Sequence, residues 1–154
     1  MLVLNIGSRS DDWRARHLSN FSSIPFILDN VVVASVEGFI QGIKFPENHI
    51  NRLLAFQSTG VEAKRFGRKA EHKFVWWNEK TIPYNSSEHH QLIEKAIRAK
   101  FGQSSVAMIA LQTTAGMVLT HDLGHPENPN TCLPAAVFCD ILTRIREEAT
   151  QARK

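Results

Sequence analysis

Between residues 35 and 45 the apolar and polar positions of the chain follow a helical period, and Ser35 is placed to cap the start of the helix. The apolar positions share one face of such a helix: Val36, Phe39, Ile40 and Ile43. The opposite face carries Glu37, Gln41 and Lys44, at spacings of four and three. Polar residues at this spacing are usually the solvated face of an amphipathic helix. A solvated face normally carries more charge, however, and Glu37 is the only charged residue between Asp29 and Lys44.

Two glycines, Gly38 and Gly42, lie beside this polar stripe. Each glycine costs a helix roughly 1 kcal/mol relative to alanine. Their spacing of four predicts that something approaches the helix backbone closely, either a neighbouring helix or a ligand.

The same patterns predict the remaining elements. Strands are expected at 2–6, 74–77, 81–84 and 117–121, with a hairpin at 26–33 that turns at Asp29-Asn30. Helices are expected from Pro46 with Ile50, Leu53 and Leu54 on their apolar face, at 59–68 after a capping box, at 86–101 after Asn85, at 106–111, and from Pro134 with Phe138, Ile141, Leu142 and Ile145 inward. Residues 7–23 are typical of a loop. This irregular order favours an α+β fold, a single compact domain over 1–154 with several helices packed on a small set of short strands.

Composition narrows the class of protein. The 154 residues are 43% hydrophobic and 21% charged, which is typical of one globular domain. No apolar run approaches the roughly 20 residues needed to span a bilayer. The net charge of +3 suits a phosphate-bearing ligand, and no block of lysine and arginine resembles a nucleic-acid-binding tail.

Cysteine usage and the N-terminus predict a cytoplasmic protein. Cys132 and Cys139 form neither a disulfide framework nor a zinc motif. The first residues, MLVLNIGSRSDDW, lack the basic region and the apolar length of a signal peptide.

Glu37 and Lys44 are the first candidates for chemistry. A half-buried carboxyl group can act as a general acid or base, and a lysine in the same cleft can bind phosphate or attack a sugar carbon. A helix separates them by about 10 Å along its axis, so they would serve one substrate from two points.

Three other segments carry candidate residues. Asn20 and Phe21 offer hydrogen bonds and a stacking face, although a loop with one anchoring Phe is the more common reason for such a segment. The pair Trp76-Trp77 could stack on a base, whereas such neighbours in a strand more often cover the core and the surface. His121 and His125 have the spacing of a helical zinc site, but Gly124 and Pro126 argue against a helix there.

Taken in order, these segments resemble one known family. The motifs are LSNF at 18–21, SVEGFIQGIKF at 35–45, AKRFG at 63–67, a Trp-containing strand at 74–77, AIRAKFGQ at 96–103, LQTT at 111–114 and LTH at 119–121. Their order and spacing are similar to those of the NADAR family, also called YbiA-like N-glycosidases, over nearly the whole chain.

The resemblance implies an α+β domain that hydrolyses a bond between ribose and nitrogen, without a metal or cofactor. The implied partners are a small nucleotide-like substrate with ribose and phosphate, such as a riboflavin-pathway intermediate, and ADP-ribosylated guanine, including ADP-ribosylated nucleic acid. Glu37 and Lys44 would be the catalytic pair. The implied substrate-binding residues are Ser19, Asn20, Phe21, Gln41, Trp76, Trp77, Lys100, His121 and Asp122.

Two other functions stay open at this point. One is a non-catalytic module that binds ADP-ribose or a nucleotide in the same pocket. The other is a metal-dependent phosphohydrolase built on His121, Asp122 and His125. The chain also departs from the family, since a late Asp-x-x-Trp-Gly motif is replaced here by HDLGHPENP at 121–129. A missing aromatic wall would change which base fits the pocket.

Overall fold

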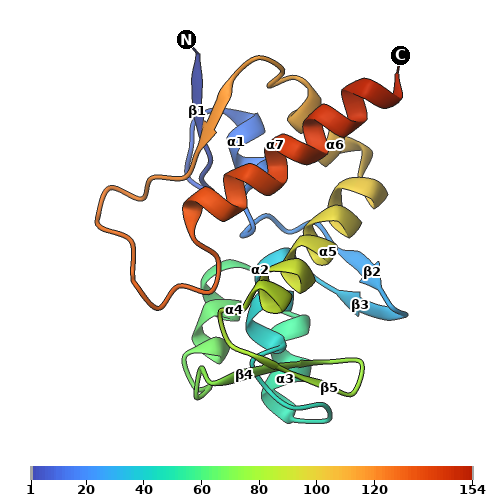
Figure 1. The fold of residues 1–154 in the computed structure, drawn as a ribbon, viewed down its shortest axis with the longest axis vertical. Coiled ribbons are helices and arrows are strands. Elements are labelled where there is room, and N and C mark those ends of the chain that lie inside the picture. The colour runs from blue at the N-terminus through green and yellow to red at the C-terminus, as the bar shows by residue number, and fades with distance from the viewer. Residues whose placement is uncertain (1, 154) are drawn as a thin grey trace.

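The computed structural model describes residues 2–153 and has an α+β fold (Figure 1), as the sequence predicts. Its elements, in chain order, are β1 (Val3–Asn5), α1 (Trp13–Leu18), β2 (Phe26–Leu28), β3 (Val31–Val33), α2 (Val36–Gly42), α3 (Ile50–Phe56), α4 (Gly60–Gly67), β4 (Phe74–Trp77), β5 (Lys80–Pro83), α5 (Ser87–Gln103), α6 (Ser105–Gln112), β6 (Val118–Thr120) and α7 (Ala135–Ala152). No helix within residues 2–153 is long and apolar enough to cross a membrane.

The described strands pair into three separate two-stranded sheets. The strands β1 and β6, which lie far apart in the sequence, pair in parallel with Leu4 opposite Leu119. The other two sheets are hairpins, β2–β3 and β4–β5. Both hairpins turn through two residues with positive φ, Asp29-Asn30 and Asn78-Glu79, which is the geometry that twisted two-residue hairpins require.

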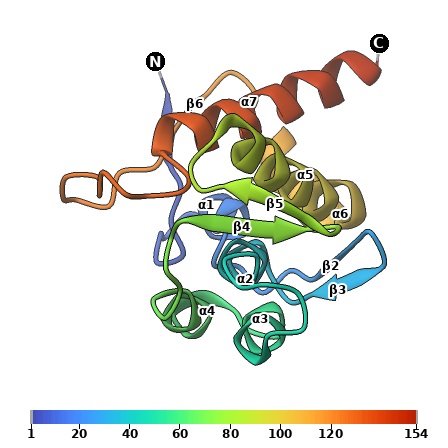
Figure 2. The ribbon, with the colours of Figure 1, turned by 60° about the horizontal axis from the view of Figure 1, so that its bottom comes forward.

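Helix α2 lies at the centre of the lower half of the molecule in Figure 1. Figure 2 shows the β4–β5 hairpin on one side of α2 and the helices α3 and α4 on the other. Ser35 begins α2 as its N-cap, because its Oγ accepts a hydrogen bond from Gly38 N at 2.9 Å, as the sequence predicts.

The core is continuous through both halves of the molecule. In the lower half the ring of Phe39 packs against Phe26, Phe56 and Trp77. In the upper half the long helices α5 and α7 bury their apolar faces, and the α7 face holds the residues that the sequence predicts: Phe138, Ile141, Leu142 and Ile145.

Several expected elements are wrong in detail. Residues 7–23 are not all loop, since Asp12 caps helix α1. Ser86, not Asn85, caps α5, and the Thr59 side chain makes no capping bond to α4.

The helix expected from Pro46 begins at Ile50, and its outward face carries the apolar residues Ile50, Leu53 and Leu54. The buried face holds Arg52, Ala55 and Phe56 instead. Arg52 replaces the expected apolar contacts because its guanidinium donates to the carbonyls of Phe45 and Trp76 and lies over the Phe56 and Trp77 rings.

Candidate functional site

A cavity of about 970 Å³ opens between the Ser19–Phe21 segment, α2, α4 and the long segment between β6 and α7. We call this last segment, residues 121–134, the 121–134 loop; it is drawn in orange in Figure 1. The lining includes eight of the eleven predicted site residues: Ser19, Asn20, Phe21, Glu37, Gln41, Lys44, His121 and Asp122. The structure thus brings together residues that are up to about a hundred positions apart in the chain.

Glu37 lies in the first turn of α2, and its side chain is 8% exposed. Its Oε1 accepts a hydrogen bond from Gln41 Nε2 at 2.7 Å, and its backbone N–H donates to Asn20 O at 3.0 Å. Burial raises the pKa of the Glu37 carboxyl, while the Gln41 bond and the charges of Lys64, Lys44 and His121 act in the opposite direction. A carboxyl with a raised pKa is suited to act as a general acid or base toward a bound substrate.

The two α2 glycines face helix α3. The close neighbour that their spacing predicts is therefore a helix and not a ligand. A Cβ on Gly38 would lie 2.6 Å from Ala55 O, and a Cβ on Gly42 would overlap the ring of Phe56. These glycines therefore let α3 approach α2, and the polar face of α2 is left to the cavity.

Lys44 lies just beyond the end of α2, whose last helical residue is Gly42. Its side chain is 8% exposed, and its Nζ lies 5.9 Å from the centroid of the Tyr84 ring. Within residues 2–153, no hydrogen bond or ion pair engages this ammonium group. A buried amine without a protein anion beside it is available to a ligand.

Phe21 forms part of the cavity wall next to α4. Its ring lies 5.9 Å from Lys64 Nζ, and the same ring is in van der Waals contact with the position that a Cβ of Gly60 would occupy. The Phe21 backbone N–H donates to Ser19 Oγ, which fixes the turn that presents Asn20 and Phe21.

Three predicted binding residues do not line the cavity. Trp77 belongs to the core, where its Nε1 donates to Asp29, and Trp76 lies next to Phe74 on the hairpin. Lys100 is 1% exposed and lies behind the Ser19–Phe21 segment, where its Nζ donates to Ser19 O and Ser22 Oγ, both at 3.0 Å. Trp77 and Lys100 point into the protein because their strand and helix use that face for packing, whereas Trp76 lies on the opposite face of its strand beside exposed Phe74.

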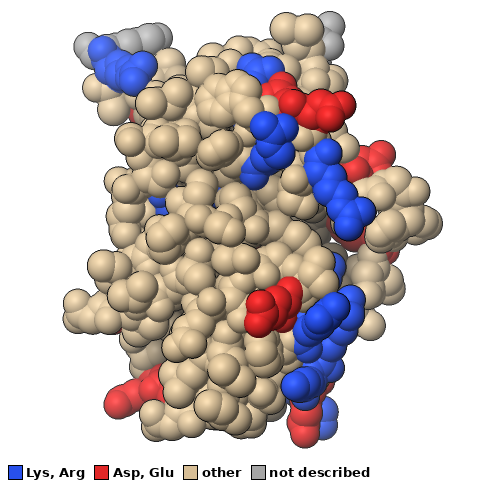
Figure 3. Space-filling model, turned by 180° about the vertical axis from the view of Figure 1, so that it is seen from behind, with Lys and Arg blue, Asp and Glu red and all other residues tan. Residues whose placement is uncertain are grey.

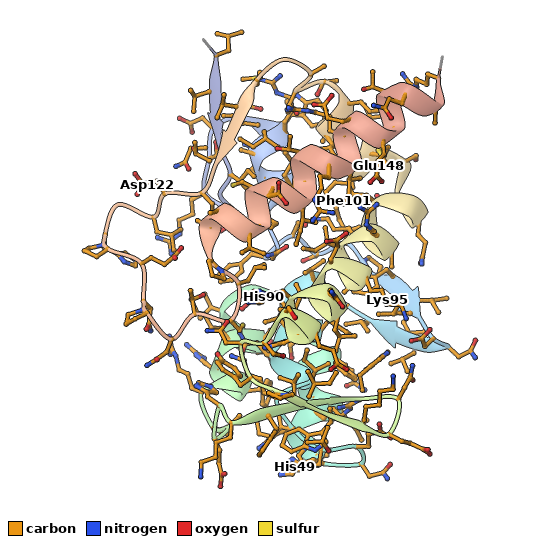
Figure 4. The ribbon with its side chains drawn as sticks, in the orientation of Figure 1. His49, His90, Lys95, Phe101, Asp122 and Glu148 are labelled. Atoms are coloured by element: carbon orange, nitrogen blue, oxygen red, sulfur yellow. The ribbon has the colours of Figure 1, made fainter. Side chains whose placement is uncertain are left out.

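The 121–134 loop contributes His121 and Asp122. His121 Nδ1 bonds to Ile6 O at 2.9 Å, and its ring packs edge-on against Phe138. Asp122 is exposed at the start of the loop (Figure 4), and its Oδ1 accepts a bond from Gly124 N. Across residues 2–153, no group of three or more histidine, cysteine or acidic side chains is placed to hold a metal ion.

The sequence reasoning missed several cavity residues, among them Lys64, Arg68, His72, Tyr84 and Cys132. Lys64 lies in α4 and Arg68 caps its C-terminal end, and their spacing of four was a usable signal because it puts both cations on one side of the helix. Figure 3, which shows the molecule from behind, has one group of lysine and arginine side chains at its lower right, on the side where Figure 1 places α4. Tyr84 gave no such signal. It follows the short strand β5, and the polar and apolar residues of that strand show no spacing that would mark the next position as part of a site.

Known proteins resemble this chain over most of its length. The family model described as bacteriophage protein GP30.3 matches residues 12–147. A 17.1 kDa protein in the Gp30-rIII intergenic region of Enterobacteria phage T4 is 28% identical over 140 residues, which are 88% of this chain and 91% of that protein. N-glycosidase YbiA of Shigella sonnei is 29% identical over 127 residues, 82% of this chain and 71% of the relative.

A solved structure shares the fold. The NMR structure of the E. coli protein YbiA superimposes with a TM-score of 0.69 at 25% identity, over 99% of this chain and 87% of that one. The family model, the relatives and the shared fold agree with the family resemblance of the sequence. The chain therefore belongs to the bacteriophage protein GP30.3 family, within the NADAR or YbiA-like group.

Proposed function

We propose that this chain is an N-glycosidase that cleaves the bond between C1′ of a ribose and a nitrogen, in a phosphorylated ribose or an ADP-ribose conjugate. The observation that carries the proposal is the Glu37 carboxyl, which is buried at the cavity and has a raised pKa. The relatives named N-glycosidase YbiA support the reaction class. The cations Lys44, Lys64 and Arg68 on the cavity wall support a substrate with phosphate.

The chemistry follows from the bond that breaks. As the nitrogen leaves, positive charge develops at C1′ and the ring oxygen, and an enzyme must stabilise that charge and protonate the leaving base. Water then supplies the hydroxyl at C1′, and its proton replaces the one given to the nitrogen. Protonated Glu37 can act as the acid, and its carboxylate can stabilise the cation or accept the proton of water.

Lys44 has two chemically distinct roles in this scheme. As an ammonium group it binds a phosphate or a ribose hydroxyl. As a neutral amine it attacks C1′ of the opened ribose, displaces the nitrogen and forms a Schiff base, which water then hydrolyses.

The deciding experiment is incubation of the purified protein with riboflavin-pathway N-ribosides and with ADP-ribosylated guanosine, followed by mass spectrometry. The wild-type chain is expected to release the free base and a sugar phosphate from the N-ribosides, and guanosine and ADP-ribose from the conjugate, whereas Glu37→Gln is not. Tight binding without release would favour the non-catalytic binding module. Activity that EDTA abolishes and zinc or magnesium restores would favour the phosphohydrolase.

Two variants separate the roles of Lys44. Lys44→Arg keeps the charge, so it retains part of the turnover if Lys44 only binds, whereas a guanidinium stays protonated and forms no Schiff base. Borohydride present during turnover traps a sugar adduct on Lys44 only in the covalent mechanism. A folded Lys44→Ala protein that turns over at the wild-type rate would exclude both roles.

A further inference from the structure

Gln41 is the only described side chain that donates a hydrogen bond to Glu37. It lies one helical turn after Glu37 on α2, and its Nε2 is 2.7 Å from Glu37 Oε1. Gln41 is 5% exposed, and among the described residues its Oε1 has no hydrogen-bond partner. Only the nitrogen end of the Gln41 amide is hydrogen-bonded, and its oxygen end is not. Hydrogen bonds alone therefore do not fix the orientation of this side chain, so packing must help to fix it.

Gly67, the last residue of α4, supplies that constraint. The Gln41 side chain fills the place where a Cβ on Gly67 would lie, and its Oε1, Cδ and Cβ all approach that position. Gly67 is buried, and its φ lies outside the left-handed region, so its backbone accepts other residues. Glycine is required here for the room that Gln41 needs and for no conformational reason.

We propose that Gln41 is a positioning residue that orients the Glu37 carboxyl toward the cavity, and that the missing side chain of Gly67 keeps the Gln41 amide in place. Only the expected effect of these residues on turnover rests on the N-glycosidase function proposed above. The atom that donates to Glu37 also decides how readily the carboxyl binds a proton, because a donated N–H favours the carboxylate. The pKa of Glu37 is therefore a direct readout of this contact, and it needs no substrate.

Other charged groups act on Glu37 and stay in place in the test. Lys64 comes from α4, Lys44 follows α2, and His121 comes from the 121–134 loop. None of them is altered by a substitution at position 41 or 67. The measurement is therefore made on free protein by ¹³C NMR titration of the Glu37 side-chain carboxyl.

Gln41→Met keeps the length of the side chain and removes the donor. The pKa of Glu37 is expected to rise by about one pH unit, the size that goes with loss of one hydrogen bond to a charged group. Gly67→Ala is expected to raise it in the same direction, because the new methyl displaces the end of a flexible side chain and not the backbone. The double variant is expected to match Gln41→Met alone, since Gly67 acts through Gln41.

Gly102→Ala is the matched control. Gly102 also lies in a helix, and nothing is within 4 Å of the position of its Cβ, so the pKa of Glu37 is expected to be unchanged. The proposal is overturned if Gln41→Met leaves the pKa of Glu37 unchanged, or if folded Gly67→Ala does so. Shifts that add in the double variant overturn the link between Gly67 and Gln41.

The limb of the kcat/KM profile that reports Glu37 should move with its pKa in the same variants; this is the acid limb if Glu37 acts as a carboxylate and the alkaline limb if it acts as a general acid. If the variants shift the pKa of Glu37 in the NMR titration but leave the pH profile of kcat/KM of an active enzyme unchanged, the positioning role of Gln41 stands and the catalytic role of Glu37 fails. Where no substrate is cleaved at all, the NMR titration still decides the positioning role.

Discussion

At the scale of single residues, burial of the Glu37 carboxyl lowers the stability of the protein when the group is charged, and the same burial suits the group to acid–base chemistry. Burial raises the pKa of its carboxyl, so the folded protein binds its proton more tightly than the unfolded chain does. The contribution of Glu37 to stability is therefore greatest at acidic pH, below its unfolded value. It declines as the pH rises through the folded pKa.

Glu37→Gln is expected to lower turnover by about 100-fold or more, the usual loss when general acid–base help is removed. The variant should also be at least as stable as the wild type at pH 8, because the buried charge is gone, and should show no such advantage at pH 4. Urea denaturation at both pH values measures this difference. Glu71→Gln, at an exposed position, is the control and should change neither quantity. Near-normal turnover in folded Glu37→Gln would exclude the catalytic role.

Lys100 gives the opposite dependence on pH. Burial lowers its pKa from 10.5 to about 7, so between these values the unfolded chain holds a proton that the folded protein has released. Lys100 therefore makes stability rise with pH over this window. Lys100→Met is expected to reduce the slope of unfolding free energy between pH 7 and 10, compared with Lys95→Met on the same helix, whose side chain is 58% exposed. Equal slopes in the two variants would contradict this account.

At the scale of elements, the sequence predicted correctly those features that depend on residues close together in the chain. The hairpin at Asp29-Asn30, the Ser35 cap and the apolar face of α7 depend on residues close together in the chain, and the structure has all three. The prediction of which face of α3 is buried was wrong. Arg52 is buried on that helix because its guanidinium donates hydrogen bonds to the backbone carbonyls of Phe45 and Trp76. No period in the sequence reveals partners of that kind.

The crossing of α2 and α3 depends on Gly42. Helix propensity alone would make Gly42→Ala stabilising by up to about 1 kcal/mol. The added methyl overlaps the Phe56 ring, however, and overpacking of this kind costs about 1–3 kcal/mol. We expect a net loss of stability in urea denaturation, whereas Gly102→Ala, with open space around its Cβ, should be neutral or stabilising. A more stable Gly42→Ala protein would show that α3 can move away from α2.

At the scale of the whole molecule, the site is an assembly of distant segments. Glu37, Gln41 and Lys44 were predictable as a group because they belong to one short segment. Lys64, Arg68 and Tyr84 reach the same cavity through tertiary packing, whereas Trp77 packs in the core and Trp76 lies on the other face of its strand. A sequence pattern indicates which face of an element is polar, but not what lies opposite that face.

The 121–134 loop closes one side of this assembly, and Tyr84 holds it. Tyr84 Oη donates to Asn130 O at 3.0 Å, and its ring stacks on His72 at a centroid distance of 5.3 Å. Burial raises the pKa of the Tyr84 phenol, so the hydroxyl remains a donor at neutral pH. The loop itself is mostly exposed, and its other anchors include hydrogen bonds to Asn5, Ile6 and Ala135. Exposed segments of this kind open at low free-energy cost.

Tyr84→Phe removes the hydroxyl and keeps the ring beside Lys44 and His72. We expect amide hydrogen exchange in residues 121–134 to become several-fold faster, while exchange in α5 and α7 stays unchanged, because one hydrogen bond to the loop is worth only about 0.5–1.5 kcal/mol. Thr143→Val, which removes a hydroxyl bonded within α7, is the control and should leave the loop unchanged. A loop that closes over bound substrate would also give Tyr84→Phe a higher KM with little change in kcat. Unchanged exchange in the loop would mean that packing around buried Cys132, and not the Tyr84 hydroxyl, keeps the loop over the cavity.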